Sequence, residues 1–99
     1  MSIGPETADQ YGPADVPPLH LGIVIRMHYS DHAPAHFHAR SGEYEARVEI
    51  ATGNVLSGFV PRQAAAMVRE WAALHRAELE LNWDRAKAEQ PLATIEPLP

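Results

Sequence analysis

Histidines are concentrated in one short part of this chain. Five of the six lie between His20 and His38, and three of those five share the run Asp31-His32-Ala33-Pro34-Ala35-His36-Phe37-His38. Histidine is the side chain best suited to exchange a proton or bind a transition metal near neutral pH. The same run also holds an aspartate and a proline turn. We therefore expect any chemical site of the chain to be centred on residues 31–38.

The first interpretation of this run is a metal site. Its expected ligands are imidazoles and a carboxylate from the run itself, namely His32, His36, His38 and Asp31. A further carboxylate would come from Glu43 or Glu45. The chain has no cysteine, so thiolate ligands are excluded. Imidazole and carboxylate ligands suit a divalent transition metal, that is zinc, iron or nickel.

The second interpretation is catalysis without a metal. His36 or His38 would act as a general acid or base, and Arg26, Arg40 or Arg47 would stabilise an anion. RNA cleavage needs such proton transfer and charge stabilisation, so a small hydrolase or ribonuclease fits this set. In a third, purely structural interpretation, the histidines form hydrogen bonds with the turn backbone and with each other. The sequence leaves these three interpretations open.

Arginines form a second group of candidate binding residues. They are Arg40 and Arg47 in the expected sheet, and Arg62, Arg69 and Arg76 in the expected helical region. The last three are seven residues apart, so on a continuous helix they would form one basic stripe for a phosphate backbone or an acidic partner. Neighbouring glutamates favour a simple solvated helix face instead. The net charge of -5 disfavours ordinary RNA or DNA binding.

Four strands are predicted to position these side chains. Residues 22–29 alternate in polarity, which directs Arg26 and His28 away from the core, and residues 36–40 continue the pattern with Phe37 inward. Ser41-Gly42 predicts a hairpin turn into a strand at 43–50, and a fourth strand follows at 55–60. Strands joined in this way form an antiparallel meander, so the histidines and arginines should share one polar patch.

The remaining chain is predicted to be helical. Pro61 suits the first turn of a helix, and apolar residues then recur at helical spacing as Ala64, Met67, Val68, Trp71, His75, Leu79, Trp83 and Ala86. The pattern does not decide whether the helix breaks between 75 and 77. Pro91 ends it, and residues 92–99 should lie extended against the body. The expected fold class is α+β, an antiparallel four-stranded meander backed by two C-terminal helical segments, with both tryptophans in the core.

Length and composition set the domain organisation. The 99 residues suffice for one small domain. Residues 1–20 are rich in proline and glycine and are expected to be a disordered or loosely attached leader, followed by a single α+β domain at 21–99. No stretch approaches the roughly 18 apolar residues of a membrane span, and no targeting segment precedes the domain. We therefore expect a cytoplasmic protein with no membrane contact.

Three sequence runs resemble a family of short bacterial proteins known as domain of unknown function four-one-six-zero. They lie at 22–27, 31–39 and 70–76, and the second contains the signature Asp-His-x-Pro-x-His-Phe-His. The similarity extends over roughly residues 21–98. It implies a partnership with a second small protein encoded by a neighbouring gene, similar to toxin–antitoxin modules. This chain departs from the family pattern at Ala35, where a second proline is usual, and at His28, where an aromatic residue is usual.

The functional expectation has two branches. The leading one is a small regulatory or partner-binding module, one half of a toxin–antitoxin-like pair, whose partner is the neighbour-encoded protein. The alternative is a metal-binding protein or small hydrolase acting through His32, His36 and His38, with an arginine clamp. A homodimer is also expected, since no charge protects the edge of the strand at 55–60.

Overall fold

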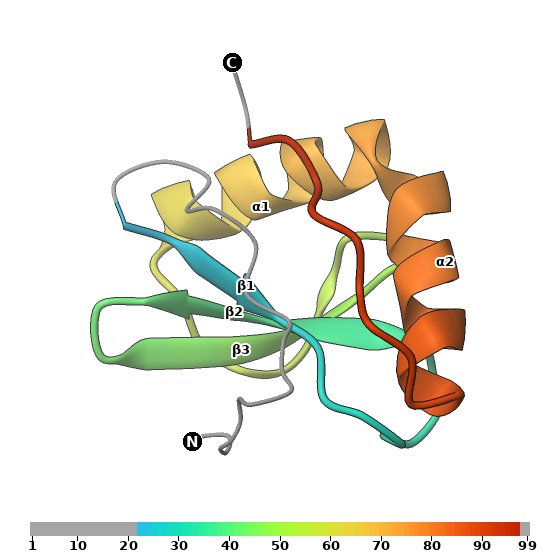
Figure 1. Cartoon of the computed structure of the whole chain (residues 1–99). Coiled ribbons are helices and arrows are strands. Elements are labelled where there is room, and N and C mark those ends of the chain that lie inside the picture. The colour runs from blue at the N-terminus through green and yellow to red at the C-terminus, as the bar shows by residue number, and fades with distance from the viewer. Residues whose placement is uncertain (1–21, 98–99) are drawn as a thin grey trace.

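A computed structural model describes residues 22–97, which form one sheet and two helices (Figure 1). The strands are β1 (Val24–Arg26), β2 (His36–Ser41), β3 (Tyr44–Glu49) and β4 (Val55–Gly58), and the helices are α1 (Arg62–Leu74) and α2 (Arg76–Lys87). The leader expected at 1–20 lies outside the described residues. The strands pair antiparallel in the order β1-β2-β3-β4. The predicted α+β meander with two C-terminal helices is confirmed.

Strict alternation along the strands gives the sheet two different faces. The core face is apolar and almost fully buried, and its side chains include Ile25, Phe37, Ala39, Ala46 and Val48. The opposite face, which we call the polar face, carries Arg26, His36, His38, Arg40, Glu45, Arg47, Glu49 and Ser57. Because the side-chain period of a strand is two, the register of the meander decides which polar groups become neighbours.

Three of the four strands are shorter than their polarity patterns predict, whereas β2 extends one residue further, to Ser41. β1 ends at Arg26 rather than Tyr29, although Met27 is still buried beyond the strand. The chain leaves the sheet here because Ser30 adopts a left-handed conformation (φ 57°) and its backbone N–H bonds to the carbonyl oxygen of Ala86 at the end of α2, at 3.2 Å. The polarity pattern of residues 22–29 gives no sign of this tertiary contact, and it therefore predicted a longer strand.

β4 forms an irregular edge. Val55 pairs with Val48 and Ser57 with Arg47, so Leu56 is an extra residue in a β-bulge. Gly58 follows with φ +80°, and a Cβ atom at this position would lie 2.4 Å from the carbonyl oxygen of Glu45. Only glycine fits such a close backbone approach with a positive φ.

The helices cover the core face and one end of the sheet (Figure 1). Trp71 of α1 is fully buried and meets Phe37 edge-to-face, with ring centroids 5.8 Å apart. His75 has non-helical backbone angles (φ -117°, ψ 26°), so the helix breaks there and α2 begins at Arg76. Trp83 of α2 is also buried, as predicted.

The segment after α2 runs back across both helices. The buried Asn82 side chain donates to the carbonyl oxygen of Ala93 and accepts from the Ala93 N–H, both at 2.9 Å. Farther along, the Trp71 indole N–H donates to the carbonyl oxygen of Glu96 at 2.7 Å, and Ile95 is buried in the core. The predicted extended packing is therefore present as far as residue 97. Within the described part, neither helix has the length and apolar character needed to cross a membrane.

Candidate functional site

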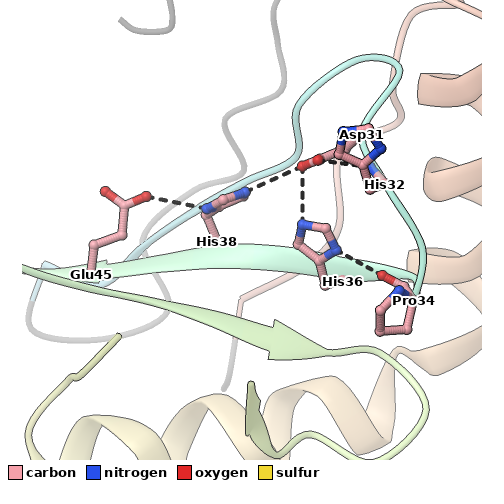
Figure 2. A network of polar contacts seen from close by, with 6 residues as sticks. All are labelled: Asp31, His32, Pro34, His36, His38 and Glu45. Atoms are coloured by element: carbon pink, nitrogen blue, oxygen red, sulfur yellow. Dashed lines mark hydrogen bonds and ion pairs between the residues drawn. The ribbon is translucent and has the colours of Figure 1, made fainter. Parts of the chain in front are cut away.

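Asp31 is held over the polar face by a loop that is fastened to α2. Besides the Ser30 N–H bond to Ala86, the Ser30 hydroxyl donates to Oε2 of Glu89 at 3.2 Å. Asp31 follows directly, and its Oδ1 accepts the backbone N–H of His32 at 2.8 Å. This local bond fixes the carboxylate rotamer, so that Oδ2 faces the histidines of β2 (Figure 2).

His36 connects this loop to the sheet. Its Nδ1 lies 2.7 Å from the carbonyl oxygen of Pro34 and its Nε2 lies 3.0 Å from Asp31 Oδ2 (Figure 2). Both partners accept hydrogen bonds and neither can donate, so the arrangement is satisfied when both ring nitrogens donate. Although His36 belongs to the polar face, it is only 2% exposed, because Trp83 of α2 packs on its ring with centroids 5.2 Å apart. His36 thereby orients Asp31.

His38 lies between two carboxylates. Its Nδ1 is 3.2 Å from Glu45 Oε2 on β3, and its Nε2 is 3.5 Å from Asp31 Oδ2 (Figure 2). The Nε2 atom is buried and has no hydrogen-bond partner among the described residues. A carboxylate beside Nδ1 favours the tautomer with its proton on that nitrogen, which leaves the lone pair on Nε2. In this neutral form His38 directs the lone pair of Nε2 toward Asp31, whereas a protonated His38 would form an ion pair with that carboxylate.

His28 completes the cluster from the end of β1. Its ring stacks on the His38 ring, with centroids 4.0 Å apart and an interplanar angle of 11°. One ligand atom each from His28, Asp31 and His38 lies within 4.8 Å of the other two. We call these three residues the His-Asp-His cluster. They form a two-histidine, one-carboxylate set that opens to solvent on the side of His28.

Burial sets the protonation states of this cluster. Burial lowers the pKa of His28 below its ordinary value, against the opposing charges of Asp31 and Glu45. Burial also lowers the pKa of His38, and the neighbouring His28 lowers it further. For Asp31, burial raises the pKa, but the His32 N–H bond and the adjacent His36 and His38 together outweigh it, and the pKa lies below its usual range. At neutral pH the cluster therefore offers two neutral imidazoles and one ionised carboxylate.

The sequence-predicted ligands are only partly brought together. Asp31 and His38 belong to the cluster, whereas both ring nitrogens of His36 face protein acceptors. The exposed His32 contributes only its backbone N–H to Asp31. Glu45 contacts His38, while Glu43 is exposed in the hairpin and lies outside the cluster.

The sheet arginines flank the cluster through the register. Arg26 and Arg47 are the direct cross-strand partners of His38, on β1 and β3 respectively. Arg40 is exposed and pairs in register with Glu45. The arginines predicted to bind an anion therefore share the polar face with the histidines.

The helical arginines do not form the single stripe that a continuous helix would have given them, because the break at His75 separates Arg76 from the other two. Arg69 donates to the side chain of Asn54, and Arg76 donates to the carbonyl oxygen of Ile50 at 3.4 Å. Arg62 begins α1 and is exposed. Two of these three side chains therefore fasten the helices to the turn between β3 and β4.

His28 is the residue that the sequence-based ligand set lacks. The alternation of residues 22–29 already placed it on the same side as Arg26, and it precedes Asp31 by one short turn. These two features of the sequence could have identified His28 as a candidate ligand. The expected strand, however, would have kept it in the sheet instead of letting it leave the strand and stack on His38.

Comparison with known proteins gives a family but no characterised relative. No curated protein and no solved structure matches the chain significantly. A family model described as Domain of unknown function (DUF4160) matches residues 22–84, which include the whole His-Asp-His cluster and all four strands. This match covers more than half of the chain, and the chain therefore belongs to the DUF4160 family.

Proposed function

We propose that this chain binds one divalent transition-metal ion through His28, Asp31 and His38, in a site with open coordination positions. The observation that carries the proposal is the buried His38 Nε2, which has no hydrogen-bond partner in the described part of the chain and lies 3.5 Å from Asp31 Oδ2. The lone pair of a buried imidazole nitrogen that faces a partly buried carboxylate oxygen is unfavourable. A cation between them removes that penalty.

The geometry suits an ion of the zinc, iron or nickel class. Two ligands of a tetrahedral ion, each at about 2.0–2.2 Å, lie about 3.4 Å apart, close to the 3.5 Å between His38 and Asp31. Glu45 and His36 supply the outer contacts that metal-binding histidines and carboxylates normally have. Three protein ligands leave room for water or substrate, as in catalytic metal centres. This supports metal-assisted hydrolysis as the chemistry.

The test is metal analysis of untagged protein, because a polyhistidine tag would bind metal itself. Wild type, Asp31→Asn and His38→Gln are offered zinc, iron(II) and nickel, dialysed, and examined by elemental analysis and native mass spectrometry. We expect about one ion per wild-type chain and none in the two variants. Circular dichroism shows whether each variant is folded.

His32→Gln is the matched control, since His32 belongs to the same run but lies outside the cluster. It should retain the ion. If His32→Gln lost the metal and His38→Gln retained it, the proposed ligand set would be wrong. Metal-free wild-type protein would refute the proposal.

A second candidate function is binding of a partner protein, and the exposed β4 edge favours it. All four β4 residues are exposed, and Tyr44 and Phe59 form an exposed edge-to-face pair with centroids 5.3 Å apart. An edge strand binds a further strand through its free backbone groups. We propose a strand of the neighbour-encoded small protein as the occupant, in a toxin–antitoxin-like pair.

Co-expression with that protein tests this second function. A stable complex at micromolar concentration that is lost in Phe59→Asp supports it. Leu74→Asp is the control, since Leu74 is equally exposed but lies on α1. Separate elution of the two proteins contradicts the proposal, and a wild-type homodimer would assign the edge to a second copy of the chain.

A further inference from the structure

One row of side chains crosses all four strands of the polar face. Arg26, His38, Arg47 and Ser57 are successive cross-strand partners from β1 to β4. Directly opposed residues on one face have Cβ atoms about 4.5–5.5 Å apart. The histidine of the cluster therefore has an arginine on each side, and a hydroxyl lies at the end of the row.

Arg47 carries a second unsatisfied polar atom. Its Nε is buried and has no hydrogen-bond partner among residues 22–97. A buried donor without an acceptor costs free energy. The N–H groups of a guanidinium form a planar fork that matches two oxygens of one oxyanion. The residue whose Nε–H lacks an acceptor is thus the direct cross-strand neighbour of the residue whose Nε2 lacks a hydrogen-bond partner among residues 22–97.

The charge of the polar face indicates which anion fits. Its three arginines (Arg26, Arg40 and Arg47) face three carboxylates (Asp31, Glu45 and Glu49). A bound divalent metal would add two positive charges to this balanced set. A carboxylate ligand offers one negative charge and two oxygens. A phosphate dianion offers two charges and enough oxygens to reach the metal and the guanidinium together.

We infer that the metal-loaded cluster binds the phosphoryl group of a phosphate or phosphate ester, with Arg47 as the second binding group. This inference rests on the proposed metal site. One phosphoryl oxygen occupies an open coordination position of the ion, and another accepts from the Arg47 guanidinium. Metal ions and arginines act together on phosphoryl groups in this way.

The test uses the full-length untagged chain loaded with cobalt(II), whose visible spectrum reports on its coordination. Inorganic phosphate, phenyl phosphate and acetate are titrated at constant ionic strength into wild type, Arg47→Gln and the control Arg62→Gln. Arg62 is exposed on α1, away from the row. We expect saturable spectral changes with the two phosphates, and weak ones with acetate. Arg47→Gln should keep its cobalt affinity and bind phosphate about 10- to 100-fold more weakly, as loss of a charge-assisted hydrogen bond predicts.

The outcomes separate this inference from the proposed function. Cobalt binding with no response to either phosphate overturns the inference and leaves the metal site intact. No cobalt binding refutes both. Equal phosphate affinity in wild type and Arg47→Gln overturns the assignment of Arg47, and equal binding of acetate overturns the phosphoryl preference. A response to phenyl phosphate supports an ester ligand, whereas a response to inorganic phosphate alone supports free phosphate.

Discussion

Replacing His36 with leucine tests the network that orients the cluster. Leucine fills a similar volume but removes both donors at once. The bond to the ionised Asp31 contributes about 1.5–3 kcal/mol and the bond to the Pro34 carbonyl about 0.5–1.5 kcal/mol. Because the Asp31 side chain is 21% exposed, water replaces part of the lost contact. We expect the free energy of unfolding of the metal-free protein to fall by about 2–4 kcal/mol.

The assay pairs urea unfolding with metal competition. His32→Leu, an exposed site in the same loop, should change stability by less than about 0.5 kcal/mol. Metal affinity, measured against a chromophoric chelator, should fall about 10- to 100-fold in His36→Leu, since His36 orients a ligand without being one. If His36→Leu kept both the stability and the metal affinity of the wild type, the reasoning would be refuted. The hydrogen bonds of His36 would then contribute neither to the stability of the fold nor to the orientation of Asp31.

Three further predictions concern pH, the C-terminal segment and the β4 edge. Burial lowers the pKa values of His28 and His38 below those of an exposed histidine, so at mildly acidic pH these two side chains bind fewer protons in the folded metal-free protein than in the unfolded chain. The free energy of unfolding of the metal-free protein should therefore decrease as the pH falls from 7 to 5. An increase in the urea midpoint as the pH falls over this range would contradict the expected direction. Asn82→Leu removes the two buried hydrogen bonds to Ala93 and should lower the free energy of unfolding by about 2–4 kcal/mol. Thermal unfolding measures this change, and an unchanged Tm would refute the expectation. Gly58→Ala should destabilise the chain more than Gly42→Ala, because both have positive φ but only the former places a Cβ against a carbonyl of β3; equal urea midpoints would show that this close approach is absent.

Local pattern determined much of this fold in advance. The alternation of residues 22–50 predicted the meander and the two faces of the sheet, and the helical spacing from Ala64 onward predicted the packing of Trp71. The sequence left open whether the helix breaks between 75 and 77, because no glycine or proline marks a break there. The break follows from the need of α2 to turn across the end of the sheet, where Trp83 meets His36.

The run at 31–38, where the sequence predicted a site, supplies two of the three residues of the His-Asp-His cluster, because its turn returns Asp31 over β2. The third residue, His28, lies outside that run. The separate roles of His36 and His38 depend on neighbours that are remote in sequence. Trp83 buries His36, and Glu45 across the hairpin fixes the orientation of His38. Two histidines on one strand face look equivalent in the sequence until such contacts distinguish them.

The bond between Ser30 and Glu89 also has a consequence for the order of folding. It spans 59 residues of chain, so the loop that carries Asp31 reaches its final place only when α2 has docked. Long-range closures of this kind follow local hairpins and helices in time, since more chain entropy is lost before the contact forms. The three residues of the proposed metal site therefore come together late, and uptake of the proposed ion would report that the whole domain has folded. A ribosome-bound chain that still lacks α2 would contain His28, Asp31 and His38 without the assembled cluster.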